Sequence, residues 1–223
     1  MPALVYQESR PRDVSGPPVL LIHGFATDSS DFAGWADALS RAGRASILVD
    51  LPGHGASPAP ASADDAGTSR ILEAIAAIAP GEIDVVGYSL GARLAWDLPR
   101  VAPVRRLVLG GLSPFEPFAA LDFAQLATFL TTGEPPADPL TGMLGGMISA
   151  PGKDAAALAL VMQGLAAEPF DPSSPPTVPT LFVAGDADPM TADAPWPVVR
   201  VPGDHVGALR SPEFREAALA FLA

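Results

Sequence analysis

The chain has 223 residues, 48% of them hydrophobic, and this size and composition predict one domain with a substantial core over residues 1–223. It contains no cysteine, which excludes disulfides, thiolate metal sites and cysteine nucleophiles. The formal net charge of −12, with a single lysine, argues against nucleic-acid binding because phosphate contacts need a basic face.

Strand and helix signals alternate along the chain, which predicts an α/β fold with a mostly parallel central sheet flanked by helices. The last helix has Ser211-Pro212 as its cap and first-turn pair, and it spaces Phe214, Ala218 and Phe221 along one face. The expected strands lie near residues 3–8, 18–22, 45–50, 83–87, 105–110, 179–184 and 197–201. The other expected helices lie near residues 29–42, 71–78, 92–98, 119–131 and 153–167.

The segment Gly87-Tyr88-Ser89-Leu90-Gly91 follows one of these strands and precedes a helix. A serine in G-x-S-x-G at such a junction is typical of a nucleophile elbow, a tight turn that lifts the hydroxyl above the sheet. The flanking glycines are needed because a Cβ at either position would meet neighbouring backbone. The pattern therefore predicts that Ser89 is a nucleophile.

A nucleophilic serine needs a base, and the chain has three histidines, His23, His54 and His205. Enzymes with this elbow present their triad in the chain order Ser, Asp or Glu, His. Only His205 follows Ser89, so His205 is the predicted base.

The acid of such a triad must lie between Ser89 and His205, and Asp186 and Asp188 both follow the strand expected at 179–184. Ligand chemistry in open parallel sheets gathers at the carboxyl ends of strands, so either carboxylate is a candidate. Asp204 is a poor candidate because it neighbours His205, and successive side chains in an extended segment diverge. Asp193 is a weaker candidate than either.

Four motifs in this order resemble those of the α/β-hydrolase superfamily. His23-Gly24-Phe25 looks like its oxyanion loop, and residues 50–57 are similar to its D-x-P-G-H-G-x-S loop. Residues 87–91 match the elbow, and residues 185–189 match G-x-x-D-P, whose aspartate is the triad acid. The resemblance thus favours Asp188 over Asp186. It implies a serine hydrolase that cleaves an ester or thioester without metal or cofactor.

The resemblance also implies where a developing oxyanion would bind. The backbone N–H groups of Phe25 and Leu90 are the expected donors, while His23 and His54 are expected to be structural.

Two departures from the family pattern stand out. Only one strand precedes the 18–22 run, and the 17 positions from Asp188 to His205 leave no room for the helix that the family carries there.

Residues 114–178 occupy the place of the family's lid over the active site, so we expect a lid insertion there. This segment contains no arginine, one lysine and seven carboxylates. Four of its apolar side chains are candidates either to line an adaptable pocket or simply to pack the lid on the core: Phe115, Phe118, Met143 and Met147.

Two other functions remain open. Residues 87–93 also resemble the elbow of the menaquinone-pathway synthase that eliminates pyruvate, which has an arginine four residues after the serine, as Arg93 is here. A structural role is nevertheless the favoured interpretation of Arg93. The second alternative is a ligand-binding protein that keeps the scaffold without catalysis.

No leader-like segment or membrane-spanning run is evident, so we expect a cytoplasmic protein that acts on a small-molecule substrate, with no membrane partner. Its oligomeric state is left open.

Overall fold

A computed structural model describes residues 2–223 and confirms the predicted α/β fold. The strands form one sheet in the order β1-β3-β2-β4-β5-β6-β7. β1 pairs antiparallel with β3, and every other neighbouring pair is parallel. Each strand lies within two residues of its predicted bounds: β1 Val5–Ser9, β2 Val19–Ile22, β3 Ser46–Asp50, β4 Ile83–Tyr88, β5 Val104–Gly110, β6 Thr180–Gly185 and β7 Val198–Val201.

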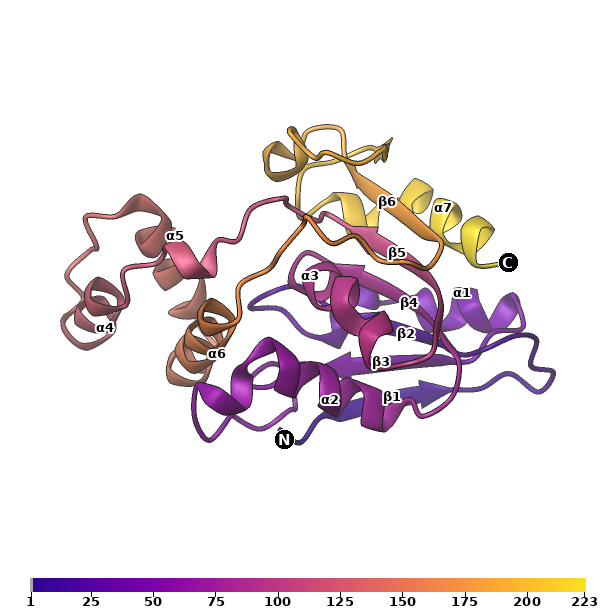
Figure 1. The fold of residues 1–223 in the computed structure, drawn as a ribbon, viewed down its shortest axis with the longest axis horizontal. Helices are drawn as coiled ribbons and strands as arrows, with labels where there is room; N and C mark the ends of the chain where they lie inside the picture. The colour runs from indigo at the N-terminus through magenta and orange to yellow at the C-terminus, as the bar shows by residue number, and fades with distance from the viewer. Residues whose placement is uncertain (1) are drawn as a thin grey trace.

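Helices cover both faces of the sheet (Figure 1). Side chains alternate between the faces, so Leu20 and Ile22 of β2 enter one core cluster while Val19 and Leu21 enter the other. The first cluster includes α2 and α3, and the second includes α1 and α7. No helix within residues 2–223 is long and apolar enough to cross a membrane. The helices are α1 Trp35–Arg41, α2 Thr68–Ile78, α3 Leu90–Asp97, α4 Phe123–Thr132, α5 Pro139–Ile148, α6 Ala155–Ala167 and α7 Pro212–Leu222.

Besides the expected helix at 119–131, which is a 3-10 turn at Phe118–Ala120 followed by α4, two helical segments differ from the prediction. The expected helix at 29–42 is split into a 3-10 turn, Ser29–Phe32, and α1, because Gly34 between them has a φ of +78°. The second difference is α5, which the sequence did not predict. Asp138 accepts a hydrogen bond from the Thr141 N–H as its N-cap, and Leu144 and Ile148 are buried in the core.

Helices α4, α5 and α6 all lie between β5 and β6 in the chain, and we call residues 114–178 the insert. In Figure 1 these helices form a group to one side of the sheet, joined to it by two extended segments. The insert is not separate from the core, because Leu158, Val161 and Leu165 of α6 belong to the same buried cluster as α2 and α3.

The connection from β6 to β7 is short, as predicted, and contains the 3-10 turn Pro189–Thr191 in place of an α-helix. Arg200 of β7 braces this turn. Its Nη1 donates to Thr191 Oγ1 at 2.8 Å and to the Gly185 carbonyl at 3.0 Å, and its Nη2 donates to the Thr191 carbonyl at 2.8 Å. These hydrogen bonds hold in place the loop that begins at Asp188.

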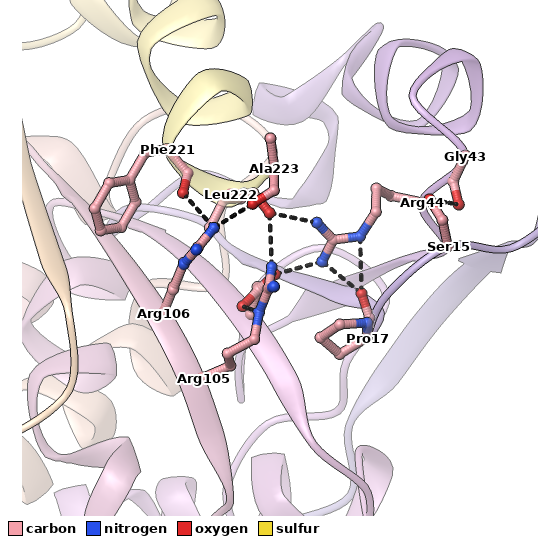
Figure 2. A network of polar contacts seen from close by, with 10 residues as sticks. Ser15, Pro17, Gly43, Arg44, Arg105, Arg106, Phe221, Leu222 and Ala223 are labelled. Atoms are coloured by element: carbon pink, nitrogen blue, oxygen red, sulfur yellow. Dashed lines mark hydrogen bonds and ion pairs between the residues drawn. The ribbon is translucent and has the colours of Figure 1, made fainter.

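At the opposite end of the sheet, a cluster of arginines binds the end of α7 (Figure 2). Arg44 and Arg105 both pair with the buried Asp84 carboxylate and both donate to the Leu222 carbonyl. Arg106 donates to the Phe221 carbonyl at 2.8 Å. Cations at the carboxyl end of a helix satisfy its last carbonyls and oppose its dipole. The network thus fixes the helix that follows His205 against β4, β5 and the segment that precedes β3.

Candidate active site

Ser89 lies at the turn from β4 to α3 in the strained conformation expected of an elbow. Its φ of +52° is in the left-handed region, which a non-glycine residue rarely adopts. A Cβ at Gly87 would lie 2.3 Å from the Gly91 carbonyl oxygen, and one at Gly91 would lie 2.0 Å from the Ile22 carbonyl oxygen. Only glycine fits at both positions, as the sequence predicts.

The side chains of Ser89, His205 and Asp188 form one hydrogen-bonded line. His205 Nε2 lies 3.0 Å from Ser89 Oγ, and His205 Nδ1 lies 2.9 Å from Asp188 Oδ2. Asp188 is buried, and its other oxygen accepts the Met190 N–H at 2.9 Å. An ionised carboxylate only accepts, so Nδ1 carries the hydrogen and Nε2 is free to accept the serine proton.

The other candidate acids have different roles in the structure. Asp186 is exposed, and its Oδ1 accepts the Gly203 N–H at 3.1 Å. Asp204 Oδ1 accepts the N–H groups of Val206 and Gly207, which shapes the loop after His205. Asp193 is exposed on the connection between β6 and β7. The imidazole is therefore paired with Asp188 alone among these carboxylates.

Tyr88 positions the backbone of His205, a contact that the sequence analysis missed. Its hydroxyl donates to the His205 carbonyl at 2.7 Å, and its ring packs against the rings of His205 and Phe214. Burial raises the pKa of the Tyr88 phenol, so the group stays a donor. The position of Tyr88 inside the elbow motif was the available signal. The contact fixes His205 despite the short connection before it.

The two predicted oxyanion donors are free. Neither the Phe25 N–H nor the Leu90 N–H donates to any group within residues 2–223, and both residues line the same cavity as Ser89. The first N–H groups of a helix have no partner within that helix, which accounts for Leu90 at the start of α3. Two unpaired donors beside a nucleophile can bind a developing oxyanion.

His23 and His54 support the loop that carries Phe25. His54 Nε2 accepts the Ala26 N–H at 3.0 Å, and its Nδ1 lies 2.8 Å from the Pro52 carbonyl. His23 Nε2 accepts the Leu51 N–H at 3.0 Å. Burial lowers the pKa of His54 to about 3 and also lowers that of His23. Both rings are thus neutral backbone braces.

A cavity of about 360 Å³ opens above Ser89 between the insert and the core. Its lining is mostly apolar, and the charged side chains in it are paired within residues 2–223. Arg210 lies 3.3 Å from Asp31 at the rim, and Arg93 lies 2.8 Å from Glu116. Five exposed hydrophobic side chains line the cavity: Phe115, Met143, Met147, Met190 and Val206.

A family model described as the alpha/beta hydrolase fold matches residues 17–150, which include the elbow and the two histidine loops. The chain belongs to this family. The resemblance found in the motifs is thereby confirmed. This α/β hydrolase is also similar to pimeloyl-[acyl-carrier protein] methyl ester esterase of Nitrosomonas europaea, with 39% identity over 104 residues. That alignment covers 45% of this chain and only 39% of the relative.

Two solved structures share the fold over nearly the whole chain. A hydrolase from Pseudomonas aeruginosa superposes with a TM-score of 0.73 at 22% identity, covering 99% of this chain and 94% of that one. E-2-(acetamidomethylene)succinate hydrolase superposes with a TM-score of 0.65 at 26% identity, covering 98% of this chain and 94% of that one. Both superpositions therefore show that the likeness in fold extends beyond the matched residues 17–150 to nearly the whole chain.

Proposed function

We propose that this α/β hydrolase is a serine hydrolase that cleaves a carboxylic ester or thioester with a small, apolar acyl group. The observation that carries the proposal is the hydrogen-bonded line from Ser89 Oγ through His205 to Asp188, at 3.0 and 2.9 Å. The name of the Nitrosomonas europaea relative, a methyl ester esterase, supports the reaction class.

The proposed mechanism begins with attack of Ser89 Oγ on the substrate carbonyl carbon. His205 Nε2 takes the serine proton, and the Asp188 carboxylate stabilises the resulting imidazolium. The N–H groups of Phe25 and Leu90 bind the oxyanion. The intermediate collapses as His205 returns the proton to the departing alcohol or thiol. Water then attacks the acyl-enzyme. His205 Nε2 takes a proton from this water and gives it to Ser89 Oγ, which releases the carboxylic acid.

The charge and the apolar side chains of the insert favour an acyl group that is apolar and uncharged. We propose that residues 1–223 act as one catalytic domain and that residues 114–178 are its lid. The segment adds seven carboxylates and one lysine, and its apolar side chains line the cavity. The arginines that line the cavity, Arg93 and Arg210, are already paired with carboxylates, so an anionic acyl chain would have to compete for them, and an unpaired buried charge is costly.

The synthase alternative gains no support from the cavity. A substrate with several carboxylates needs several basic groups, whereas the two arginines that line the cavity are paired with carboxylates, Arg93 with Glu116 and Arg210 with Asp31. The binding-protein alternative predicts no turnover of an ester, whereas an enzyme would turn over its substrate, so an ester assay distinguishes it from catalysis.

Two esters with four-carbon acyl groups test the proposal, p-nitrophenyl butyrate and the p-nitrophenyl monoester of succinate. We expect kcat/KM for the butyrate to be higher by about ten-fold or more, because the succinyl carboxylate would be desolvated without a partner. Ser89→Ala supplies the background rate. Preference for the succinyl ester would overturn the apolar specificity and favour the synthase. Turnover no faster than the background would favour a binding protein.

A further inference from the structure

Arg93 is a buried arginine on α3 whose guanidinium faces the two ends of the insert. Its Nε donates to Glu116 Oε2 at 2.8 Å, and its Nη1 donates to Thr68 Oγ1 at 2.9 Å. Its Nη2 donates to the carbonyls of Leu165 at 3.2 Å and Glu168 at 2.9 Å. A guanidinium has five N–H donors, and these partners occupy four of them.

Glu116 completes the same cluster from the first end of the insert. Its side chain is 11% exposed, and Oε2 also accepts the Phe170 N–H at 2.7 Å while Oε1 accepts the Phe118 N–H at 3.0 Å. Phe118 lies where the insert begins and Phe170 lies where it ends. One carboxylate therefore joins both ends, and Arg93 joins that carboxylate to α3.

The same cluster backs the wall of the cavity beside the predicted oxyanion donor. The Arg93 guanidinium carbon lies 6.0 Å from the centroid of the Phe118 ring. That ring packs edge-on against the Phe25 ring, with 5.4 Å between the two centroids. Phe25 in turn contacts His54, the brace of the Ala26 N–H. The Arg93 backbone N–H donates to the Ser89 carbonyl at 3.0 Å in the first turn of α3, so the side chains of the cluster start one helical turn from the nucleophile.

We infer that Arg93 and Glu116 form a clasp that fixes both ends of the insert on the nucleophile helix and thereby sets the shape of the acyl pocket. Arg93 is inferred to be a positioning residue that does not contact substrate, because four of its five donors are occupied by protein acceptors and its side chain is only 6% exposed. The inference about pocket shape rests on the proposed ester hydrolase function, whereas the clasp itself does not.

Conservative variants test the clasp. Arg93→Lys keeps the charge but has three donors on one atom, which cannot reach the same set of acceptors. Glu116→Gln places an amide NH₂ against backbone N–H groups that need an acceptor. The matched controls are Arg70→Lys and Glu73→Gln, which alter an exposed ion pair on α2. Thr68→Val removes one Arg93 acceptor and serves if the first two variants fold poorly.

Amide hydrogen exchange gives a readout that does not depend on activity. We expect exchange to become faster by ten-fold or more at residues 114–121 and 165–172 together in Arg93→Lys and Glu116→Gln, less in Thr68→Val, and unchanged in the controls. Slow exchange at both ends in a folded clasp variant would overturn the clasp.

The kinetic arm compares p-nitrophenyl octanoate with p-nitrophenyl acetate. In the clasp variants we expect the octanoate-to-acetate ratio of kcat/KM to fall several-fold, while a small fluorophosphonate still labels Ser89 at nearly the wild-type rate. A loss confined to the succinyl ester would overturn the inference, because it would make Arg93 a substrate ligand. A wild-type protein that neither turns over esters nor labels would refute the proposed function, and hydrogen exchange would still decide the clasp.

Discussion

Asp188 and Asp186 lie two residues apart but make different hydrogen bonds, which predicts different effects of removing each charge. Asp188→Asn should lower kcat by about 10⁴-fold, because an amide can no longer hold the imidazole in the required tautomer. Asp186→Asn keeps an oxygen that can accept the Gly203 N–H, so it should change kcat only a few-fold. Steady-state kinetics with p-nitrophenyl butyrate measures both. Equal losses of kcat, or a larger loss in Asp186→Asn, would show that Asp188 is the wrong carboxylate.

How far the sequence specifies the candidate site depends on how local each signal is. Ser89 and His205 could be predicted because the elbow is contiguous and one histidine follows it. The choice between Asp186 and Asp188 rested on a resemblance, since both follow β6 and the contacts that distinguish them, Asp188 with His205 and Asp186 with the Gly203 N–H, are tertiary. The partners of Arg93 lie 23 to 75 residues away, so no local pattern reveals them.

At the scale of elements, the insert is the segment whose removal tests the division of labour between core and lid. Replacing residues 114–178 with a short Gly/Ser bridge should leave a protein that still reacts with a serine probe, because Ser89, His205, Asp188 and both N–H donors lie in the core. Discrimination among acyl chain lengths should fall, since pocket walls set differences in transition-state binding.

The control for this deletion is solubility, because it exposes apolar surface of α2 and α3. Chain-length preference is read as the ratio of kcat/KM for octanoate and acetate esters. A folded, monodisperse deletion variant with an unchanged ratio would mean that core loops set specificity and that the insert only packs.

Elements with strong periodicity were predictable and glycine-rich ones were not. Most strands of the sheet carry apolar runs, and every strand was located within two residues. Helix α5 has three glycines, which lowers helix propensity, and it forms because Leu144 and Ile148 are buried and Asp138 caps it. The break at Gly34 depends on a backbone conformation that apolar spacing does not report.

For the whole molecule, the neutral histidine braces predict a dependence of stability on pH. The pKa of His54 is lowered to about 3 in the folded state, below the value of about 6.5 expected in the unfolded chain. Between these values the unfolded state binds more protons, so the contribution of His54 to stability is fully present above pH 6.5 and declines as pH falls. The maximum slope for one group is about 1.4 kcal/mol per pH unit.

Urea unfolding of wild type and His54→Gln measures this contribution, because Gln has an acceptor for the Ala26 N–H that does not titrate. We expect the stability of the wild type relative to the variant to decline between pH 6.5 and 4.5. Carboxylates that titrate in the same range are common to both proteins and cancel in the difference. A difference in unfolding free energy that is constant with pH would show that His54 is not held neutral.

Covalent labelling of Ser89 measures whether this hydroxyl is an activated nucleophile. The intact protein is treated with a fluorophosphonate, digested and analysed by mass spectrometry, with Ser89→Ala as the matched control. We expect one adduct on Ser89, because His205 is placed to activate this hydroxyl, and no adduct in the variant. An adduct on another residue, or none on the folded wild-type protein, would contradict it.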